Sequence, residues 1–564
     1  MVIKKTISII TLLTVLTLLA LSDISHAETL TDQVRTQIID TIGGPEPSAK
    51  IAPREGLPSL SPLVFQFYEG REFRPAWSDD FGPSPEAEDF LEVIRSAYRE
   101  GLNPEDYQLN KIDAVLSDLY ASQIGLEPYD VAELAGLDLI LTQAFFLYAS
   151  HMVDGRVDHQ NIYPDWVVNE RYADLAAVLN DALEAKEMKK TLADLAPPYP
   201  RYAGLKEALI QYQAIAESGG WSEVSPGPKL QRGSRGNRVA ILRQRLIISG
   251  DLASIVWEEP GVFDHDLELA VRKFQKRHGL KDDGRVGKST LKEINVPVET
   301  RIRQIALNMD RLRWLSDDMG RNYIFVNIAD FSLEVMEDER PVMAMRIIAG
   351  KDEQRSCVLS AKMTYLELNP FWRVPDSIAA KEILPQIKKE PGYLEQKNIK
   401  VFKDWKDNAK EMDPKLISWP RLRASNLGYK FRQEPGPLNP LGRIKFIFPN
   451  ECEIYLHDTP ARHLFGRTRR DLSHGCIRVE KPVELATYLL RNKETWMQKK
   501  ILTEIKKGKR QVVMLPEPVN VHIFYGTAWV DRDGVLQFRN DIYHADEIPY
   551  DLPVKRGHVA GATQ

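Results

Sequence analysis

A thiol and an imidazole lie close together in the last fifth of the sequence. His457 opens the run His457-Asp458-Thr459-Pro460, and Cys476 lies in Ser473-His474-Gly475-Cys476-Ile477-Arg478, with fifteen residues between His457 and Ser473. A thiol becomes a strong nucleophile when an imidazole takes its proton, and backbone N–H groups beside a small residue can hold the oxyanion that follows. The spacing therefore predicts Cys476 as nucleophile, His457 as general acid and base, and an oxyanion site at Gly475.

The base needs a third group to orient it. Asp458 is the neighbour of His457, but adjacent side chains on a strand point to opposite faces, so the Asp458 carboxylate is poorly placed to reach the ring. His474 is expected to shape the loop or to contact substrate, although an exchange of roles between the two histidines stays open. Arg478 could hold a substrate carboxylate bidentately or form a structural ion pair.

The same region also contains side chains that could bind a metal ion. His457, His463, Asp471, His474 and Cys476 could surround a zinc ion, but no Cys-x-x-Cys, His-Glu-x-x-His or similar ligand spacing is present. We therefore expect neither a metal nor another cofactor. The order in the chain, with the histidine before the cysteine, also argues against papain-like and NlpC-type peptidases.

The composition bounds the class of protein. A chain of 564 residues should hold several domains, and its net charge of −5 gives no sign of a nucleic-acid partner. Residues 1–27 have a basic start, an apolar core and the small-x-small site Ser25-His26-Ala27, which predicts a cleaved export signal. The apolar core is shorter than the ~20 residues that span a bilayer, so an uncleaved membrane anchor is the less favoured alternative.

Three cysteines are too few for a disulfide scaffold. An odd number leaves at least one free thiol, and for an exported chain that thiol needs a reason, which Cys476 has. Cys357 and Cys452 could pair, but two buried free thiols are the simpler expectation, because the sequence does not show their separation in space.

The chain divides into four parts by pattern. Residues 28–225 are mainly helical and end at a Pro- and Gly-containing linker, after which residues 226–296 form a compact unit. Residues 297–564 begin with a helix and continue as β-rich sequence. The insertion 376–435 has 13 Lys plus Arg against 9 Asp plus Glu, with interleaved aromatic residues. It is interpreted as a cap over the site, with a solvated surface insertion as the alternative.

Several motifs resemble known families. Phe274-Gln275, Gly279-Leu280 and Asp283-Gly284-x-x-Gly287 resemble the small three-helix peptidoglycan-binding module. The run that contains His457 and Cys476 resembles the catalytic motif of the L,D-transpeptidases, which have the YkuD fold. Further matches are Asn369-Pro370-Phe371-Trp372-Arg373-Val374-Pro375, Pro435-Gly436-x-x-Asn439-x-Leu441-Gly442 and the segment from Val521 to Tyr543. The combination is similar to the large YcbB-type (LdtD-like) L,D-transpeptidases of the Gram-negative periplasm.

The resemblance implies a fold and a set of residue roles. The fold is multidomain α+β, with a helical scaffold, a peptidoglycan-binding module and a β-rich catalytic domain that carries the cap and a C-terminal extension. The main-chain oxygen of Asp458 would orient His457, and the Gly475 and Cys476 N–H groups would hold the oxyanion. Ser473, Arg478 and Trp372 are the candidates for substrate contact, with loop hydrogen bonding and core packing as alternatives for Ser473 and Trp372 respectively.

The implied reaction is transfer between peptidoglycan stem peptides. Cys476 would attack the third residue of a tetrapeptide donor, release D-Ala, and pass the acyl group to the diaminopimelate amine of an acceptor stem, giving a 3→3 cross-link. Carbapenems would acylate the same thiol, and other wall-synthesis proteins are possible partners. Water or a lipoprotein amine as acceptor, giving an L,D-carboxypeptidase or a lipoprotein transferase, and a non-catalytic wall-binding scaffold remain as alternatives.

Overall fold

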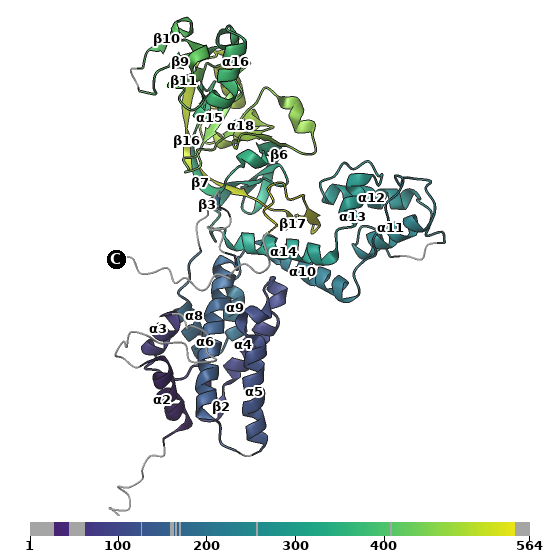
Figure 1. Ribbon diagram of the computed structural model, residues 1–564, viewed down its shortest axis with the longest axis vertical. Coiled ribbons are helices and arrows are strands. Elements are labelled where there is room, and N and C mark those ends of the chain that lie inside the picture. The colour runs from purple at the N-terminus through teal and green to yellow at the C-terminus, as the bar shows by residue number, and fades with distance from the viewer. Residues whose placement is uncertain are drawn as a thin grey trace, which may run out of the picture. The chain divides into compact units, whose positions relative to one another are not determined.

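The computed structural model describes residues 28–43, 62–125, 127–157, 163, 166–167, 171–254, 258–406 and 409–547. The described residues form two compact units (Figure 1). The first comprises the described residues up to Arg156 and those of Tyr172–Ala196, and the second comprises the described residues of Val157–Arg171 and those from Pro197 onward. The predicted export signal, residues 1–27, lies outside the described residues.

The first unit is built from helices around α6 (Val131–Asp154), which is buried along most of its length. By length and composition α6 could cross a membrane, but 67% of its apolar window is buried, as in the core helix of a globular domain. Asp138 on α6 accepts hydrogen bonds from the backbone N–H groups of Ala76 and Trp77 at 2.8 and 2.9 Å. The other helices are α2 (Leu30–Ile42), α3 (Pro62–Gly70), α4 (Pro85–Arg95), α5 (Leu109–Ile124), α8 (Leu175–Ala185) and α9 (Met188–Asp194), beside the hairpin β1 (Ser78–Asp79) and β2 (Gly82–Pro83).

The second unit contains the predicted three-helix module. Its helices are α11 (Asn237–Ile248), α12 (His265–Arg277) and α13 (Lys288–Ile294), and they enclose their own apolar core. Two further helices, α10 (Pro200–Glu217) and α14 (Val298–Arg313), pack against each other in the same unit. Residues 197–225, which the sequence pattern assigned to the helical domain, therefore group with the module and the β-rich domain.

The β-rich domain is organised by one mixed sheet in the order β12-β13-β15-β6-β5-β4-β16-β7-β3, with β14 pairing β6 and with β12 also pairing β7. Its alternating apolar residues form the largest core cluster of the protein. The multidomain α+β fold predicted from the sequence is confirmed. The strands are β3 (Trp166–Val167), β4 (Asn322–Asn327), β5 (Ser332–Glu337), β6 (Arg340–Gly350), β7 (Val358–Leu368), β12 (Ile444–Ile447), β13 (Leu456–His457), β14 (Asp471–Ser473), β15 (Ile477–Val479) and β16 (Gln511–Phe524), followed or flanked by α18 (Pro482–Leu489), α19 (Gln498–Lys506), β17 (Ala528–Val530) and β18 (Leu536–Phe538).

The basic insertion is a folded subdomain with a core of its own, not a solvated loop. Its four-stranded sheet has the order β10-β9-β11-β8, of which Figure 1 labels β9, β10 and β11, and β8 extends the sheet back to Trp372. Its elements are β8 (Trp372–Arg373), α15 (Asp376–Ile378), the π-helical turn η4 (Ala379–Ile383), α16 (Leu384–Lys389), α17 (Tyr393–Gln396), β9 (Ile399–Phe402), β10 (Glu411–Met412) and β11 (Lys430–Gln433).

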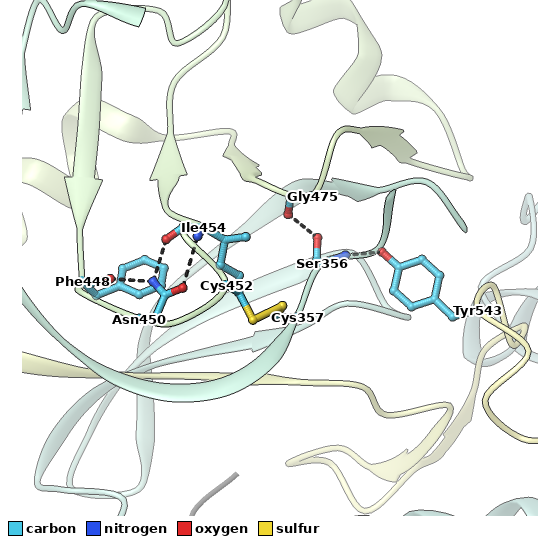
Figure 2. Close-up of a disulfide and its surroundings, with 8 residues drawn as sticks. All are labelled: Ser356, Cys357, Phe448, Asn450, Cys452, Ile454, Gly475 and Tyr543. Atoms are coloured by element: carbon cyan, nitrogen blue, oxygen red, sulfur yellow. Dashed lines mark hydrogen bonds between the residues drawn. A yellow bond between two sulfur atoms is a disulfide. The ribbon is translucent and has the colours of Figure 1, made fainter. Parts of the chain in front are cut away.

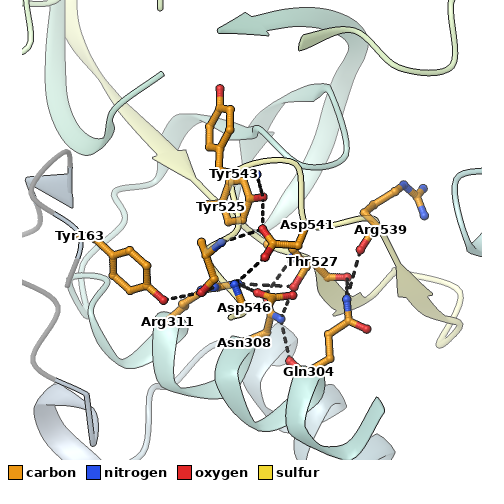
Figure 3. Close-up of polar contacts among 12 residues, drawn as sticks. Tyr163, Gln304, Asn308, Arg311, Tyr525, Thr527, Arg539, Asp541, Tyr543 and Asp546 are labelled. Atoms are coloured by element: carbon orange, nitrogen blue, oxygen red, sulfur yellow. Dashed lines mark hydrogen bonds and ion pairs between the residues drawn. The ribbon is translucent and has the colours of Figure 1, made fainter. Parts of the chain in front are cut away.

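The C-terminal segment is tied to α14 by buried polar contacts, drawn in Figure 3. The Asn308 side chain accepts from the Thr527 N–H at 2.9 Å and donates to the Thr527 hydroxyl at 2.8 Å. Arg311 pairs with Asp546 at 2.7 Å, and the Tyr525 hydroxyl donates to Asp541 at 2.6 Å. These contacts fix the segment that carries Tyr543, whose hydroxyl accepts the Ser356 N–H at 3.1 Å and donates to the Gly350 carbonyl at 2.6 Å.

Candidate active site

Strand pairing brings the two halves of the motif together. β13 lies parallel to β15, with Leu456 opposite Ile477 and His457 opposite Arg478. The Ile477 N–H donates to the Tyr455 carbonyl at 3.1 Å. Cys476 comes directly before β15, so the pairing places the nucleophile segment beside the strand that carries the imidazole.

His457 is 4% exposed, and its own neighbour orients it. Its Nδ1 lies 2.6 Å from the Asp458 carbonyl oxygen. A carbonyl only accepts, so Nδ1 must carry the proton and Nε2 is left with its lone pair, as a base requires. Burial lowers the pKa of His457 to about 3, and the positive charges of Arg478 and Lys445 add to this effect. The imidazole is therefore neutral over the whole physiological range.

The Asp458 carboxylate is hydrogen-bonded to groups other than the His457 ring. It accepts the Arg443 N–H at 2.9 Å and lies 3.3 Å from the Arg462 guanidinium. Burial raises its pKa, against the hydrogen bond from the Arg443 backbone. The main-chain oxygen and the carboxylate of Asp458 thus contact different groups, as the alternation of strand side chains predicts.

Cys476 is the free thiol of the protein and is half-buried. Burial raises the pKa of this thiol. Hydrogen bonds from the backbone and the hydroxyl of Tyr455 oppose that rise in pKa, and so do the positive charges of Lys445 and Arg478. The surroundings therefore keep the resting thiol protonated and offer a hydrogen bond and two cations to the thiolate once it forms.

Two of those groups were missed from the sequence. Tyr455 lies two residues before His457, so both side chains share a strand face, and their ring centroids are 5.7 Å apart. Lys445 on β12 lies opposite His457, and its Nζ is 3.6 Å from the centre of the Tyr455 ring. Burial lowers the pKa of Lys445. Strand alternation could have found Tyr455, whereas nothing local to the motif points to Lys445.

The loop before Cys476 is closed by a serine. The Ser473 hydroxyl donates to the Cys476 carbonyl at 2.6 Å and accepts the Gly475 N–H at 3.2 Å. Gly475 has φ of +107°, and a Cβ there would lie 3.2 Å from the Arg355 carbonyl oxygen, so the position requires glycine. Within the described chain, the Gly475 N–H is thus engaged, while the Cys476 N–H has no hydrogen-bond partner and stays open to an oxyanion. The oxyanion role predicted for Gly475 stays a prediction.

A disulfide lies next to the residue that supports this loop (Figure 2). Cys357 and Cys452 are bonded, so the expectation of two buried free thiols was wrong. Ser356, next to Cys357, donates to the Gly475 carbonyl at 2.6 Å, and its N–H donates to the Tyr543 hydroxyl at 3.1 Å. Since Cys452 lies in the turn before Tyr455 and His457, the disulfide joins the support of the loop to the start of the base strand.

The remaining predicted residues lie around this centre. His474 Nε2 is 2.7 Å from a carboxylate oxygen of Glu382 in η4, so the cap contacts the catalytic loop. Arg478 forms no ion pair within the described residues, its Nε is buried without a partner, and burial lowers its pKa. Trp372 is half-buried against the core of the cap. Over the described ranges, no three His, Cys, Asp or Glu side chains gather as a metal site would require.

The comparisons agree with this geometry. Residues 321–513 match the L,D-transpeptidase catalytic domain (YkuD), residues 235–294 the "Putative peptidoglycan binding domain" and residues 62–209 the Scaffold domain. The chain thus carries an L,D-transpeptidase catalytic domain and a peptidoglycan-binding domain, which confirms both resemblances. It is 33% identical over 272 residues to a "Putative L,D-transpeptidase" of Haemophilus influenzae, in an alignment that covers 47% of this chain. The match spans 53% of that relative, about half its length.

Solved structures add little at this distance. An L,D-transpeptidase of Xylanimonas cellulosilytica is 16% identical, with 53% of this chain and 100% of that chain covered and a TM-score of 0.17. The carbamoyl enzyme of Ldtfm with avibactam is 13% identical, with 57% and 98% covered and a TM-score of 0.17. Both TM-scores are too low to support a structural assignment, so the assignment of the catalytic domain rests on the domain matches and the site.

Proposed function

We propose that this protein is an L,D-transpeptidase that makes 3→3 cross-links in peptidoglycan through a thioester on Cys476. The observation that carries the proposal is the orientation of His457. Its Nδ1 is occupied by the Asp458 carbonyl at 2.6 Å, so Nε2 keeps its lone pair, on a strand that pairs with the residues directly after the one cysteine that is not in a disulfide. The two matched domains supply the chemistry class and the polymer.

In the first step His457 Nε2 takes the proton from the Cys476 thiol, and the thiolate attacks the carbonyl of the third residue of a tetrapeptide stem. The negative charge moves from sulfur to the carbonyl oxygen, where the Cys476 N–H can receive it. As the intermediate collapses, the C–N bond to the fourth residue breaks and Nε2 returns its proton to the leaving amine. D-Ala departs and a thioester remains on Cys476.

In the second step an amine from another stem attacks the thioester. His457 Nε2 takes the proton from that amine, and the sulfur leaves as a thiolate that is reprotonated by the imidazolium. A diaminopimelate side chain gives the 3→3 cross-link. Water or a lipoprotein amine in the same place would give a tripeptide or a protein attached to the wall.

The charges around the thiol suit both steps. Lys445 and Arg478 favour the thiolate electrostatically, and Tyr455 donates a hydrogen bond to it. Because burial opposes the charged form of Cys476, the resting thiol stays protonated, and the thiolate forms when the base takes the proton. This arrangement protects an exported thiol from oxidation, which requires the thiolate.

Further parts of the proposal follow from the expected export signal. The enzyme would act in the periplasm, where peptidoglycan is accessible. Carbapenems would acylate Cys476, since their strained amide offers the same carbonyl to the same nucleophile.

The test is to incubate the purified protein with disaccharide-tetrapeptide and to analyse the products by mass spectrometry. We expect a dimer that has lost one D-Ala, and no product from Cys476→Ala. A tripeptide alone would identify a carboxypeptidase. Product from Cys476→Ala would refute the nucleophile, and the absence of any carbapenem adduct on Cys476 would contradict the assignment of the reaction class.

A further inference from the structure

A basic cavity lies where the peptidoglycan-binding domain meets the catalytic domain, and none of its lining residues belongs to the catalytic loop 473–478. It has a volume of about 330 Å3. One wall is the turn His278-Gly279-Leu280, and the other contains residues 466–470. Both walls belong to the same compact unit.

Arginine dominates the lining. Three of the arginines are paired with carboxylates: Arg539 with Asp330 at 2.7 Å, Arg469 with Asp471 at 2.6 Å, and Arg346 with Glu480. The lining arginines are Arg346, Arg467, Arg469, Arg470 and Arg539. Five guanidinium groups thus face three carboxylates, which leaves two positive charges in excess.

The excess charge is located at Arg470 and Arg467. Arg470 donates to the carbonyls of Ile347 and Phe331 at 3.0 and 3.1 Å, contacts that carry no compensating charge. Burial lowers the pKa of Arg470, and the charges of Arg346 and Arg539 act in the same direction, against the opposing charges of Asp330 and Glu480. Arg467 is exposed, and its side chain has no hydrogen bond or ion pair within the described residues. An anion in the cavity would relieve this repulsion.

The two walls are fitted to each other. Arg539 crosses from the catalytic domain to donate to the Arg277 carbonyl at 3.0 Å. Gly279 has φ of +62°, and a Cβ there would lie 2.5 Å from Arg539 Cδ, so a glycine is required where Arg539 passes. The two walls are therefore held together at Arg539, while the exposed Arg467 side chain can turn toward a ligand.

The cavity is close to the chemistry along the chain. Residues 466–470 lead into β14, which ends at Ser473 in the catalytic loop. The six residues from Arg470 to Cys476 span at most roughly 21 Å, and two four-residue stem peptides on one glycan strand together reach roughly 26 Å. A peptidoglycan strand with one stem at Cys476 can therefore place another carboxylate in the cavity.

We propose that this cavity binds a free carboxylate of peptidoglycan outside the stem bond that Cys476 attacks, and so holds the strand on the catalytic unit. Arginine is suited to this ligand, since its planar fork pairs with a carboxylate through two parallel hydrogen bonds. The proposal rests on the proposed function only in the identity of the polymer. It adds a second anchoring point, made jointly by the two domains.

The experiment measures binding without chemistry. The full chain with Cys476→Ala is titrated with soluble, uncross-linked glycan strands that carry tetrapeptide stems, by isothermal titration calorimetry. Adding Arg467→Glu should weaken binding by about two- to thirtyfold, because one exposed charge pair contributes a factor of about 1.4 to 5 and charge reversal replaces that attraction with a repulsion of similar size. Arg467→Lys should stay within about twofold of the parent, because the charge is retained. Arg340→Glu, the same charge reversal on an exposed residue at the start of β6 outside the cavity, should leave the affinity unchanged.

The ligand chemistry is tested with the same proteins. Strands whose carboxylates have been amidated should bind the parent as weakly as native strands bind Arg467→Glu, and amidation should add little in that variant. Unchanged affinity in Arg467→Glu, or an equal loss in Arg340→Glu, would overturn the proposal. If inorganic phosphate displaced the strand with an inhibition constant similar to the dissociation constant of the strand, the cavity would be a general anion site. That result would overturn the carboxylate assignment. If Cys476 forms no product yet these differences hold, the proposed function fails and the cavity stands.

Discussion

Two short segments meet at Cys476, and they are held by different kinds of contact. The base strand, residues 455–458, orients its imidazole through the next carbonyl in the chain. The nucleophile loop, residues 473–476, is held by side chains from distant parts of the sequence: Ser356, 119 residues from Gly475, and Glu382, 92 residues from His474. The base is thus set locally and the nucleophile globally, so the two should respond differently to substitution.

Removing the base tests the base strand and should have the largest effect. His457→Ala should lower the rate of Cys476 acylation by about 10²- to 10⁴-fold, because it removes the imidazole whose Nε2 lone pair is available to take the thiol proton. Acylation by a carbapenem, followed by intact-protein mass spectrometry, measures this directly. His474→Ala serves as the matched control and should lose far less. The opposite ranking would exchange the roles of the two histidines and break the comparison.

Removing the disulfide tests the long-range support of the nucleophile loop. Cys357→Ser with Cys452→Ser should lower the free energy of unfolding by about 2–5 kcal/mol, since the bond closes a loop of 95 residues. Acylation should fall on the order of tenfold or more, because the supports of the loop and of the base strand are no longer joined. Thermal unfolding and the carbapenem assay measure the two effects.

A reductant provides the control for that pair of substitutions. Dithiothreitol should slow the parent to the rate of the double variant and leave the double variant unchanged, since Cys476 is already a free thiol. A reduced parent with full activity would show that the loop keeps its shape without the bond. Ser356 and Tyr543 alone would then be sufficient.

This contrast also explains what the sequence could predict. His457 and Cys476 could be singled out because they lie within one motif, the contact of the Asp458 carbonyl because the family resemblance implies it, and the three-helix module because its signature is local. Lys445, Ser356 and Tyr543 were not, because strand pairing and long-range hydrogen bonds place them. The disulfide was left open for the same reason: a sequence separation of 95 gives no distance in space. The cap was recognised by charge, but its own core and sheet appear only in the fold.

The contact between cap and loop should give a smaller effect. Glu382→Gln removes the carboxylate from His474 while keeping the side-chain shape. An exposed pair of this kind contributes about 0.2–1 kcal/mol, so kcat/KM for a muropeptide donor should fall by a factor of about 1.4 to 5. Glu390→Gln, on the same subdomain and exposed, should have no effect. A loss of a hundredfold would show that the cap positions the loop as strongly as Ser356 does.

The smallest expected change concerns pH and returns to the base strand. With an ordinary pKa of 6.5, an imidazole would be neutral in only about one molecule in thirty at pH 5. Burial lowers the pKa of His457 to about 3, so the neutral base persists as the pH falls from 7 to 5, and the carbapenem acylation rate should change less than about twofold. The raised pKa of Cys476 keeps the thiol protonated over this range and adds no pH dependence of its own.

Lys445→Met removes one of the cations that lower the His457 pKa, so the fall of the acylation rate at acid pH should begin at a higher pH in this variant than in the parent. A parent rate that falls with an apparent pKa near 6.5 would mean that the imidazole is hydrated rather than buried. The base would then depend on solvent as well as on the Asp458 carbonyl, and the distinction between a locally set base and a globally set nucleophile would not hold.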